Sequence, residues 1–142
     1  MTPTLRNGQS FAAGSSSSSK RMLWTGRALS GLAALFLLMD GTMKLFKPSF
    51  VLEATERLGF PISALVGIGT ILILCTILYV IPRTSVLGAA LLTGYLGGAV
   101  ATHVHARSTW FETLFPVMMG MMVWAGLVLR NSRLRQLMPF VD

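Results

Sequence analysis

The sequence has little charge and almost no cysteine. Only 12% of its 142 residues are charged, and Cys75 is the single cysteine. One cysteine excludes an internal disulfide, a paired-cysteine redox motif and a zinc site built on several cysteines. The low charge also argues against a water-soluble domain, in which about a quarter of the residues are usually charged.

Motifs of common catalytic sites are also missing. The sequence contains no glycine-rich phosphate loop, no strand pattern of a dinucleotide-binding fold and no nucleophile elbow. His103 and His105 lie at one end of the same apolar segment, so one chain cannot supply haem ligands from two facing helices. We therefore expect no catalytic centre, no metal site and no cofactor that this chain binds by itself.

Hydrophobic residues dominate what is present. They make up 53% of the sequence, and the mean hydropathy is +0.66. A helix needs roughly 20 apolar residues to cross the ~30 Å hydrocarbon core of a bilayer. The predicted spans cover residues 24–46, 62–81, 85–105 and 112–130. The sequence thus predicts an all-α fold, a transmembrane four-helix bundle within residues 22–137.

The connections between the spans differ in length. Pro82 cannot easily continue the second span and Arg83 marks a boundary, so we expect a tight hairpin between the second and third spans. Residues 48–59 place apolar side chains at helical spacing, with charged residues on the other face. This pattern predicts a short interfacial helix between spans one and two; a solvent-exposed loop is the alternative.

Two tails flank the predicted membrane domain. Residues 1–21 are rich in serine and poor in apolar side chains, so we expect a disordered tail there, and residues 138–142 form a second, short tail. A signal peptide is an alternative, because Lys20 and Arg21 precede an apolar stretch, but that stretch is long and lacks a clear cleavage site. A transit peptide is a further alternative, since the tail contains no acidic residue.

Lysine and arginine indicate the orientation, because they are retained on the side from which the chain is inserted. With the amino terminus inside, that side holds Arg6, Lys20, Arg21, Arg27, Arg83, Arg130, Arg133 and Arg135. The other side holds only Lys47, Arg57 and Arg107. We expect a bacterial inner membrane with both termini cytoplasmic; an organelle membrane fits the same pattern. The net charge of +7 indicates no nucleic-acid partner, because the basic residues lie between apolar runs.

The predicted orientation brings polar residues of three spans to one end of the bundle. Asp40 and Lys44 lie near the outer end of the first span, His103 and His105 end the third, and Glu112 begins the fourth. Ionisable groups at membrane depth tend to pair or to face a cavity. We hypothesise a polar pocket near the outer face, with Asp40, Lys44, His103 and Glu112 as candidate ligand-binding residues.

Each candidate also has a purely structural explanation. Asp40 and Lys44 are four residues apart and can form an ion pair along one helix face. His103 and His105 are two apart, so they point in different directions and suit the membrane interface. Glu112 can complement the dipole at a helix amino terminus.

The third span is rich in small residues that let another helix approach closely. The predicted packing residues are Ala90, Gly94, Gly97, Gly98 and Ala101. We expect this contact inside the bundle; contact between copies in a homo-oligomer is the alternative.

Several segments of the chain resemble the sequence pattern of one known family. They are Asp40–Leu45 at the end of the first span, Leu58–Pro61 before the second, and Leu87–His103 in the third, continuing into Pro116 and Trp124–Arg130. Over residues 27–137 the chain resembles the DoxX-like group of small four-helix membrane proteins. The resemblance implies a four-helix bundle, and Lys44 and His103 match places where the family pattern has a basic or polar residue.

The same resemblance implies two kinds of function, because relatives are similar to subunits of quinone-linked oxidoreductases or to non-catalytic assembly factors. We expect a non-catalytic accessory subunit or a bundle that binds a small ligand. The alternative is the membrane subunit of a quinone-linked complex. In that case Lys44 or His103 would hydrogen-bond a quinone oxygen, and a redox partner subunit would supply the electrons.

Overall fold

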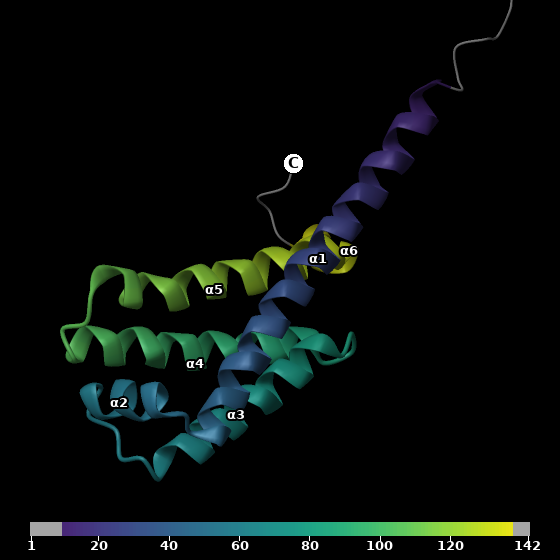
Figure 1. Ribbon diagram of the computed structural model, residues 1–142. Coiled ribbons are helices and arrows are strands. Elements are labelled where there is room, and N and C mark those ends of the chain that lie inside the picture. Colours follow the sequence, from purple (N-terminus) through teal and green to yellow (C-terminus); the bar gives the residue numbers. More distant parts are fainter. Residues whose placement is uncertain (1–9, 138–142) are drawn as a thin grey trace, which may run out of the picture.

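The structure, a computed structural model, describes residues 10–137, and these residues contain helices but no strand (Figure 1). The helices are α1 (Ser10–Phe46), α2 (Ser49–Arg57), α3 (Ala64–Val80), α4 (Ser85–His105), α5 (Trp110–Arg130) and α6 (Ser132–Leu137). Residues 1–9 and the predicted tail at 138–142 lie outside the described range.

The helices α1, α3, α4 and α5 pack against one another in a helical bundle. α1 packs against α3 and α5, and α4 packs against the same two helices, so α1 and α4 occupy opposite corners. Figure 1 shows the amino-terminal part of α1 projecting beyond the bundle, near α6, while α2 lies beside the other end. The short α3–α4 and α4–α5 connections make these pairs antiparallel neighbours, whereas the longer connection from α1 to α3 contains α2.

Three helices are long and apolar enough to cross a membrane, judged by length and composition: Ser17–Phe46 within α1, then α4 and α5. α3 is shorter than the predicted span at 62–81, with 17 residues that extend roughly 26 Å. The helix begins late because residues 61–63 form turns, in which the amide of Ala64 donates to the carbonyl of Pro61 at 2.9 Å. The hairpin predicted between α3 and α4 is present at residues 81–84.

The serine-rich segment differs from its prediction. A disordered tail was expected over residues 1–21, but α1 begins at Ser10, so residues 10–21 are helical. Extending an existing helix adds one hydrogen bond for each residue that is ordered, whereas starting a helix is unfavourable. The serine-rich residues therefore need only extend the helix that the following apolar segment forms.

Many large apolar side chains face outward from the bundle. Ile71, Leu74 and Ile77 of α3 are exposed, as are Leu32 and Leu35 of α1. A water-soluble monomer rarely exposes contiguous apolar surface on this scale. In a bilayer these side chains contact lipid, and the helices satisfy their own backbone hydrogen bonds. The exposed surface therefore fits a membrane protein.

A buried hydrogen-bond network joins three helices at the end of the bundle nearest the described termini. The Tyr79 hydroxyl of α3 lies 2.9 Å from the carbonyl oxygen of Val123 on α5 and 2.9 Å from the hydroxyl of Ser30 on α1. Because a carbonyl can only accept, Tyr79 donates to Val123 and accepts from Ser30. Arg130 donates to the Tyr79 carbonyl at 2.6 Å, and its guanidinium lies 4.8 Å from the centre of the tyrosine ring.

Replacing Tyr79 with phenylalanine is expected to lower the free energy of unfolding by about 1 kcal/mol, because Ser30 and Val123 lose their shared partner. Thermal unfolding in mild detergent measures the change. Tyr95→Phe is the matched control, since the Tyr95 hydroxyl has no hydrogen-bond partner within residues 10–137. Equal melting temperatures for the two variants would contradict a stabilising role for the Tyr79 network.

Close helix contacts are made by glycines other than those predicted. A Cβ atom at Gly126 of α5 would lie 2.6 Å from the hydroxyl oxygen of Ser30, and a Cβ atom at Gly88 would overlap the main chain of Tyr79. Helix backbones can approach closely where no side chain intervenes. These glycines therefore set the spacing of α1 with α5 and of α3 with α4.

The prediction of close packing inside the bundle by the small residues of α4 is corrected. The five residues Ala90, Gly94, Gly97, Gly98 and Ala101 are all exposed. A Cβ atom at any of the three glycines among them would meet no other atom within 4 Å. These small residues therefore make no close contact with a neighbouring helix. Contact between copies stays a prediction.

Candidate ligand-binding pocket

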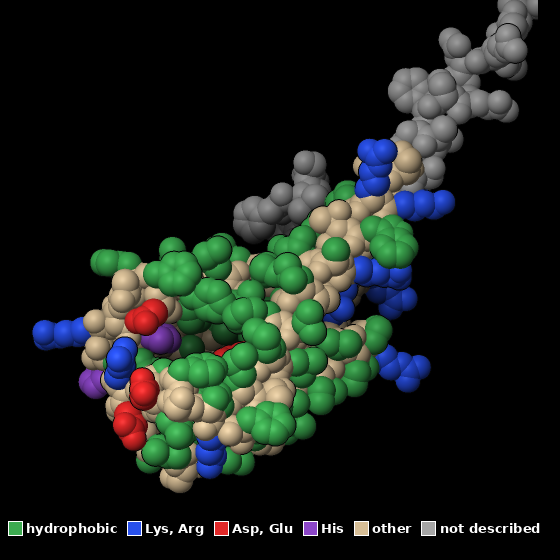
Figure 2. All heavy atoms as spheres, viewed as in Figure 1, with side chains coloured by type: hydrophobic (Ala, Val, Ile, Leu, Met, Phe, Trp, Pro, Cys, Tyr) green, Lys and Arg blue, Asp and Glu red, His purple; other side chains and the backbone are tan. Residues whose placement is uncertain are grey.

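A cavity of about 510 Å³ lies at the end of the bundle opposite the described termini. It forms where α1 and α4 end, where α3 and α5 begin, and where the α2–α3 connection closes the bundle end. Its apolar lining consists of Phe36, Leu37, Leu58, Phe60, Leu65, Ile68, Leu96, Ala99, Phe115, Pro116 and Met119. Figure 2 shows this end of the molecule hollowed, with acidic side chains and histidines gathered around the hollow.

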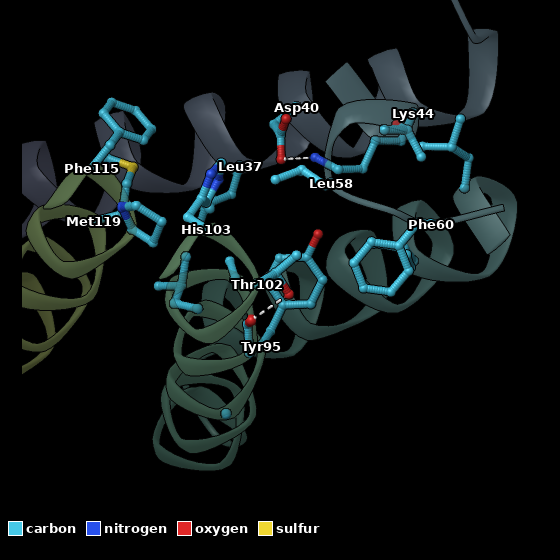
Figure 3. A pocket seen from close by; sticks show the side chains of 18 of the residues that line it. Leu37, Asp40, Lys44, Leu58, Phe60, Tyr95, Thr102, His103, Phe115 and Met119 are labelled. Carbon is cyan, nitrogen blue, oxygen red and sulfur yellow. Dashed lines mark hydrogen bonds and ion pairs between the residues drawn. The ribbon is translucent and has the colours of Figure 1, made fainter. Parts of the chain in front are cut away.

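Asp40 and Lys44 form the predicted ion pair on the wall contributed by α1. The ammonium of Lys44 donates to Asp40 Oδ2 across one turn of the helix. The Asp40 side chain keeps 40% of its surface exposed and the Lys44 side chain 21%, so the pair can be reached from the cavity but is not fully in solvent. Figure 3 shows the pair on one side of the pocket, across from Tyr95 and Phe60. Each charge is thus neutralised by the other.

His103 lies on the wall contributed by α4, where the end of the helix holds its ring. The chain turns after α4 because Arg107 adopts a left-handed conformation with φ 51°. This turn brings Ser108 back, so that its amide donates to the His103 carbonyl at 2.9 Å and its hydroxyl lies 3.2 Å from His103 Nδ1. A left-handed residue with this bonding pattern is a common helix terminus. His105 is exposed and does not line the pocket, as the two-residue separation indicated.

Glu112 does not reach the main pocket. It is exposed, and its carboxylate accepts a hydrogen bond of 3.2 Å from the amide of Thr109 at the start of α5. It lines a second, shallower cavity of about 300 Å³, which also contacts His103 and Phe115. The structural explanation of Glu112 as a helix-terminus residue therefore accounts for its contacts. The structure brings together only three of the four predicted candidates.

Tyr95 was not among the predicted site residues, but it lies on the same wall as His103. The residue is half-buried, lines the pocket and, within the described part of the chain, has no hydrogen-bond partner for its hydroxyl. A signal was present, because Tyr95 and Thr102 are seven residues apart on one helix face. Spacing alone could not show that this face points into a cavity.

Two of the glycines first assigned to helix packing line the pocket instead. Gly94 and Gly98 lie one turn apart on α4 and both border the cavity. Because they carry no side chain, they leave space that a larger residue would occupy. On the neighbouring wall, Phe36 and Phe115 pack ring against ring with centroids 5.2 Å apart. The pocket therefore combines a flat wall with an aromatic wall.

No metal centre is evident in residues 10–137, where no three His, Cys, Asp or Glu side chains lie close enough to hold one ion. The titratable groups that line the main pocket are Asp40, Lys44, Tyr95 and His103. Within the described part of the chain, the one hydrogen-bond contact between these groups and a serine or cysteine is that of His103 with Ser108 at the helix end. The arrangement suits holding a ligand by hydrogen bonds.

A model of the DoxX-like family matches residues 28–126, a range that contains every residue lining the two cavities. No curated protein and no solved structure matches the chain.

Proposed function

Because the chain belongs to the DoxX-like family and carries long apolar helices, we propose that it crosses a membrane four times and binds a small lipophilic ligand in its end pocket. The pocket is the observation that carries the proposal. Ligand sites are typically concave, of about 300–1,000 Å³, mostly apolar and supplied with a few convergent polar groups. The role is that of a non-catalytic binding bundle or accessory subunit.

The four-span arrangement is supported by the position of α3. Its sequence contains no charged residue. It packs against α1 and α4, two helices that are long and apolar enough to cross a membrane. Its 17 residues are at the lower end of the length that spans a bilayer. The amphipathic α2, with Phe50 exposed and Thr55 buried, suits the membrane interface at the pocket end.

The charge distribution supports cytoplasmic termini. In the described part of the chain the acidic residues are Asp40, Glu53, Glu56 and Glu112, and all of them lie toward the pocket end. The opposite end carries basic side chains without acidic ones (Figure 2). Basic residues favour the cytoplasmic side. We therefore place the pocket at the outer face of a bacterial inner membrane.

Cysteine labelling tests this orientation. Cysteines at Thr42 and Thr102 are expected to react with a membrane-impermeant maleimide from the periplasmic side of spheroplasts. A cysteine at Arg83, in the α3–α4 turn, is expected to react only after the membrane is opened, because that turn lies at the other end of the bundle. The background is Cys75→Ser, which removes the buried native thiol. The reverse pattern would place the pocket in the cytoplasm.

Ligand binding is tested directly with an uncharged lipophilic probe. Protein in nanodiscs is titrated with para-butylbenzyl alcohol, and empty nanodiscs of the same lipid provide the partitioning background. We expect saturable binding above that background, because the pocket offers an apolar cavity with hydrogen-bonding groups. A titration indistinguishable from empty nanodiscs, for this probe and for decylubiquinone, would refute the proposed function.

A quinone-linked membrane subunit is the second candidate, favoured by the presence of Lys44 and His103 in one cavity. Either side chain could donate a hydrogen bond to a quinone oxygen, and the electrons would come from a partner chain. In this case decylubiquinone should bind more tightly than para-butylbenzyl alcohol. Loss of decylubiquinone binding in both Lys44→Ala and His103→Ala would favour the quinone-linked membrane subunit over the non-catalytic binding bundle.

A further inference from the structure

We propose that the Asp40–Lys44 ion pair makes the pocket selective for uncharged ligands, and that the Tyr95 hydroxyl holds the polar group of such a ligand. The ligand class is an uncharged ring compound that bears an alcohol, phenol or carbonyl oxygen. This inference rests on the proposed binding function and adds to it the chemistry that the pocket accepts.

The charged residues of the pocket favour an uncharged ligand. Asp40 and Lys44 are partners on one wall, so the pocket presents a carboxylate and an ammonium that already neutralise each other. A charged ligand would have to separate this pair or remain unpaired among apolar side chains, and either is unfavourable in a partly buried site. An uncharged ligand leaves the pair intact.

The hydrogen bonds around the pocket single out Tyr95, because each of the other polar side chains that line the cavity already has at least one partner. The hydroxyl of Thr55 donates to the Val51 carbonyl at 2.7 Å, and that of Thr102 donates to the Gly98 carbonyl at 2.8 Å. His103 contacts Ser108 through Nδ1, and its Nε2 has no partner within residues 10–137. The Tyr95 hydroxyl alone, among the polar side chains that line the cavity, has no partner within residues 10–137. It can both donate and accept, which suits a neutral oxygen.

The shape of the pocket suits a planar ring. Gly94 and Gly98 leave part of the α4 wall without side chains. At either glycine, no atom outside the neighbouring backbone of α4 lies within 4 Å of the position that a Cβ would take, within the described residues. Phe36, Phe60 and Phe115 contribute rings to the other walls. Figure 3 shows Phe60 and Phe115 at different sides of the space that the Asp40–Lys44 pair and Tyr95 border. A planar ring fits between a flat wall and aromatic side chains.

Three probes of similar size and the same para-butylphenyl ring test the charge selectivity: para-butylbenzyl alcohol, para-butylbenzylamine and para-butylbenzoate. Each is titrated into protein in nanodiscs of zwitterionic lipid at neutral pH, and its binding is referred to its partitioning into empty nanodiscs. We expect the wild-type protein to bind the alcohol about tenfold more tightly than either ion. A tenfold ratio of dissociation constants corresponds to about the free energy of one hydrogen bond.

Variants of the pair should then redirect the selectivity. Lys44→Met leaves an unpaired carboxylate, so the amine becomes the preferred probe; Asp40→Asn leaves an unpaired ammonium, so the benzoate does. The exchanged pair, Asp40→Lys with Lys44→Asp, should keep the preference for the alcohol. Tyr95→Phe should weaken binding of the alcohol about tenfold. Gly97→Ala, at a position of α4 that does not line the cavity, controls for substitution in this part of the helix.

The outcomes separate the inference from the proposed function. If no probe binds above empty nanodiscs, ligand binding itself is contradicted. If the wild-type protein binds the three probes equally well, or if Tyr95→Phe binds the alcohol as tightly as wild type does, the inference is overturned while ligand binding stands. The wild-type comparison needs no variant, so it decides even where a single charge removal prevents folding.

Discussion

Gly88→Ala is expected to lower the free energy of unfolding by about 3 kcal/mol, at the upper end of what overpacking usually costs. Gly88 lies in the first turn of α4, where a Cβ atom would overlap the main chain of Tyr79. The obstacle is backbone rather than the end of a flexible side chain, so α3 and α4 must move apart. That movement also disturbs Tyr79, whose hydroxyl joins α3 to Ser30 and Val123. Reversible unfolding in mixed micelles with increasing SDS measures the loss.

Gly97→Ala on the same helix is the matched control. Gly97 is exposed, and a Cβ atom there meets nothing within 4 Å. Alanine is a better helix former than glycine by roughly 0.5–1 kcal/mol, so this variant should be as stable as wild type or slightly more stable. If Gly97→Ala were as damaging as Gly88→Ala, the exposed stripe of α4 would have to be packed, and the orientation of α4 in the bundle would be wrong.

Gly98→Leu is expected to reduce binding of para-butylbenzyl alcohol by roughly 100-fold or more, a change of about 2.7 kcal/mol. Gly98 borders the main cavity, and space is open where its Cβ would lie. A leucine side chain can therefore enter the pocket without displacing a helix. It would occupy the flat wall beside Tyr95 and exclude a ring. The nanodisc titration described for the wild-type protein measures the effect.

The adjacent Gly97→Leu separates pocket filling from a general effect on α4. It adds the same side chain to the same helix, but Gly97 does not line the cavity. Binding should therefore remain within about threefold of wild type, which is less than 1 kcal/mol. Equal retention of binding by both variants would mean that the ligand binds elsewhere. Equal loss in both would mean that α4 acts through its exposed face, for example in contact with a second copy.

Several features could be predicted because they depend on residues close in the sequence. The Asp40–Lys44 pair follows from a separation of four residues on a helix. The divergence of His103 and His105 follows from a separation of two, and the α3–α4 hairpin follows from Pro82 and Arg83. The apolar segments predicted helices that are long enough to cross a membrane, and three of them are present at that length. Motifs in the same segments predicted the family, which is confirmed.

Other features depended on how each helix is rotated about its axis in the bundle. The spacing of Gly94 and Gly98 shows that they share a face, but not whether that face meets a helix or a cavity, and the tertiary structure places it at the cavity. It likewise makes close helix contacts at Gly88 and Gly126 and buries Tyr79 in a network. Among the described residues it leaves the Tyr95 hydroxyl without a hydrogen-bond partner. Periodicity along one helix determines which residues lie together, because it is a property of that helix alone. What they face depends on the neighbouring helices, whose side chains are distant in the sequence.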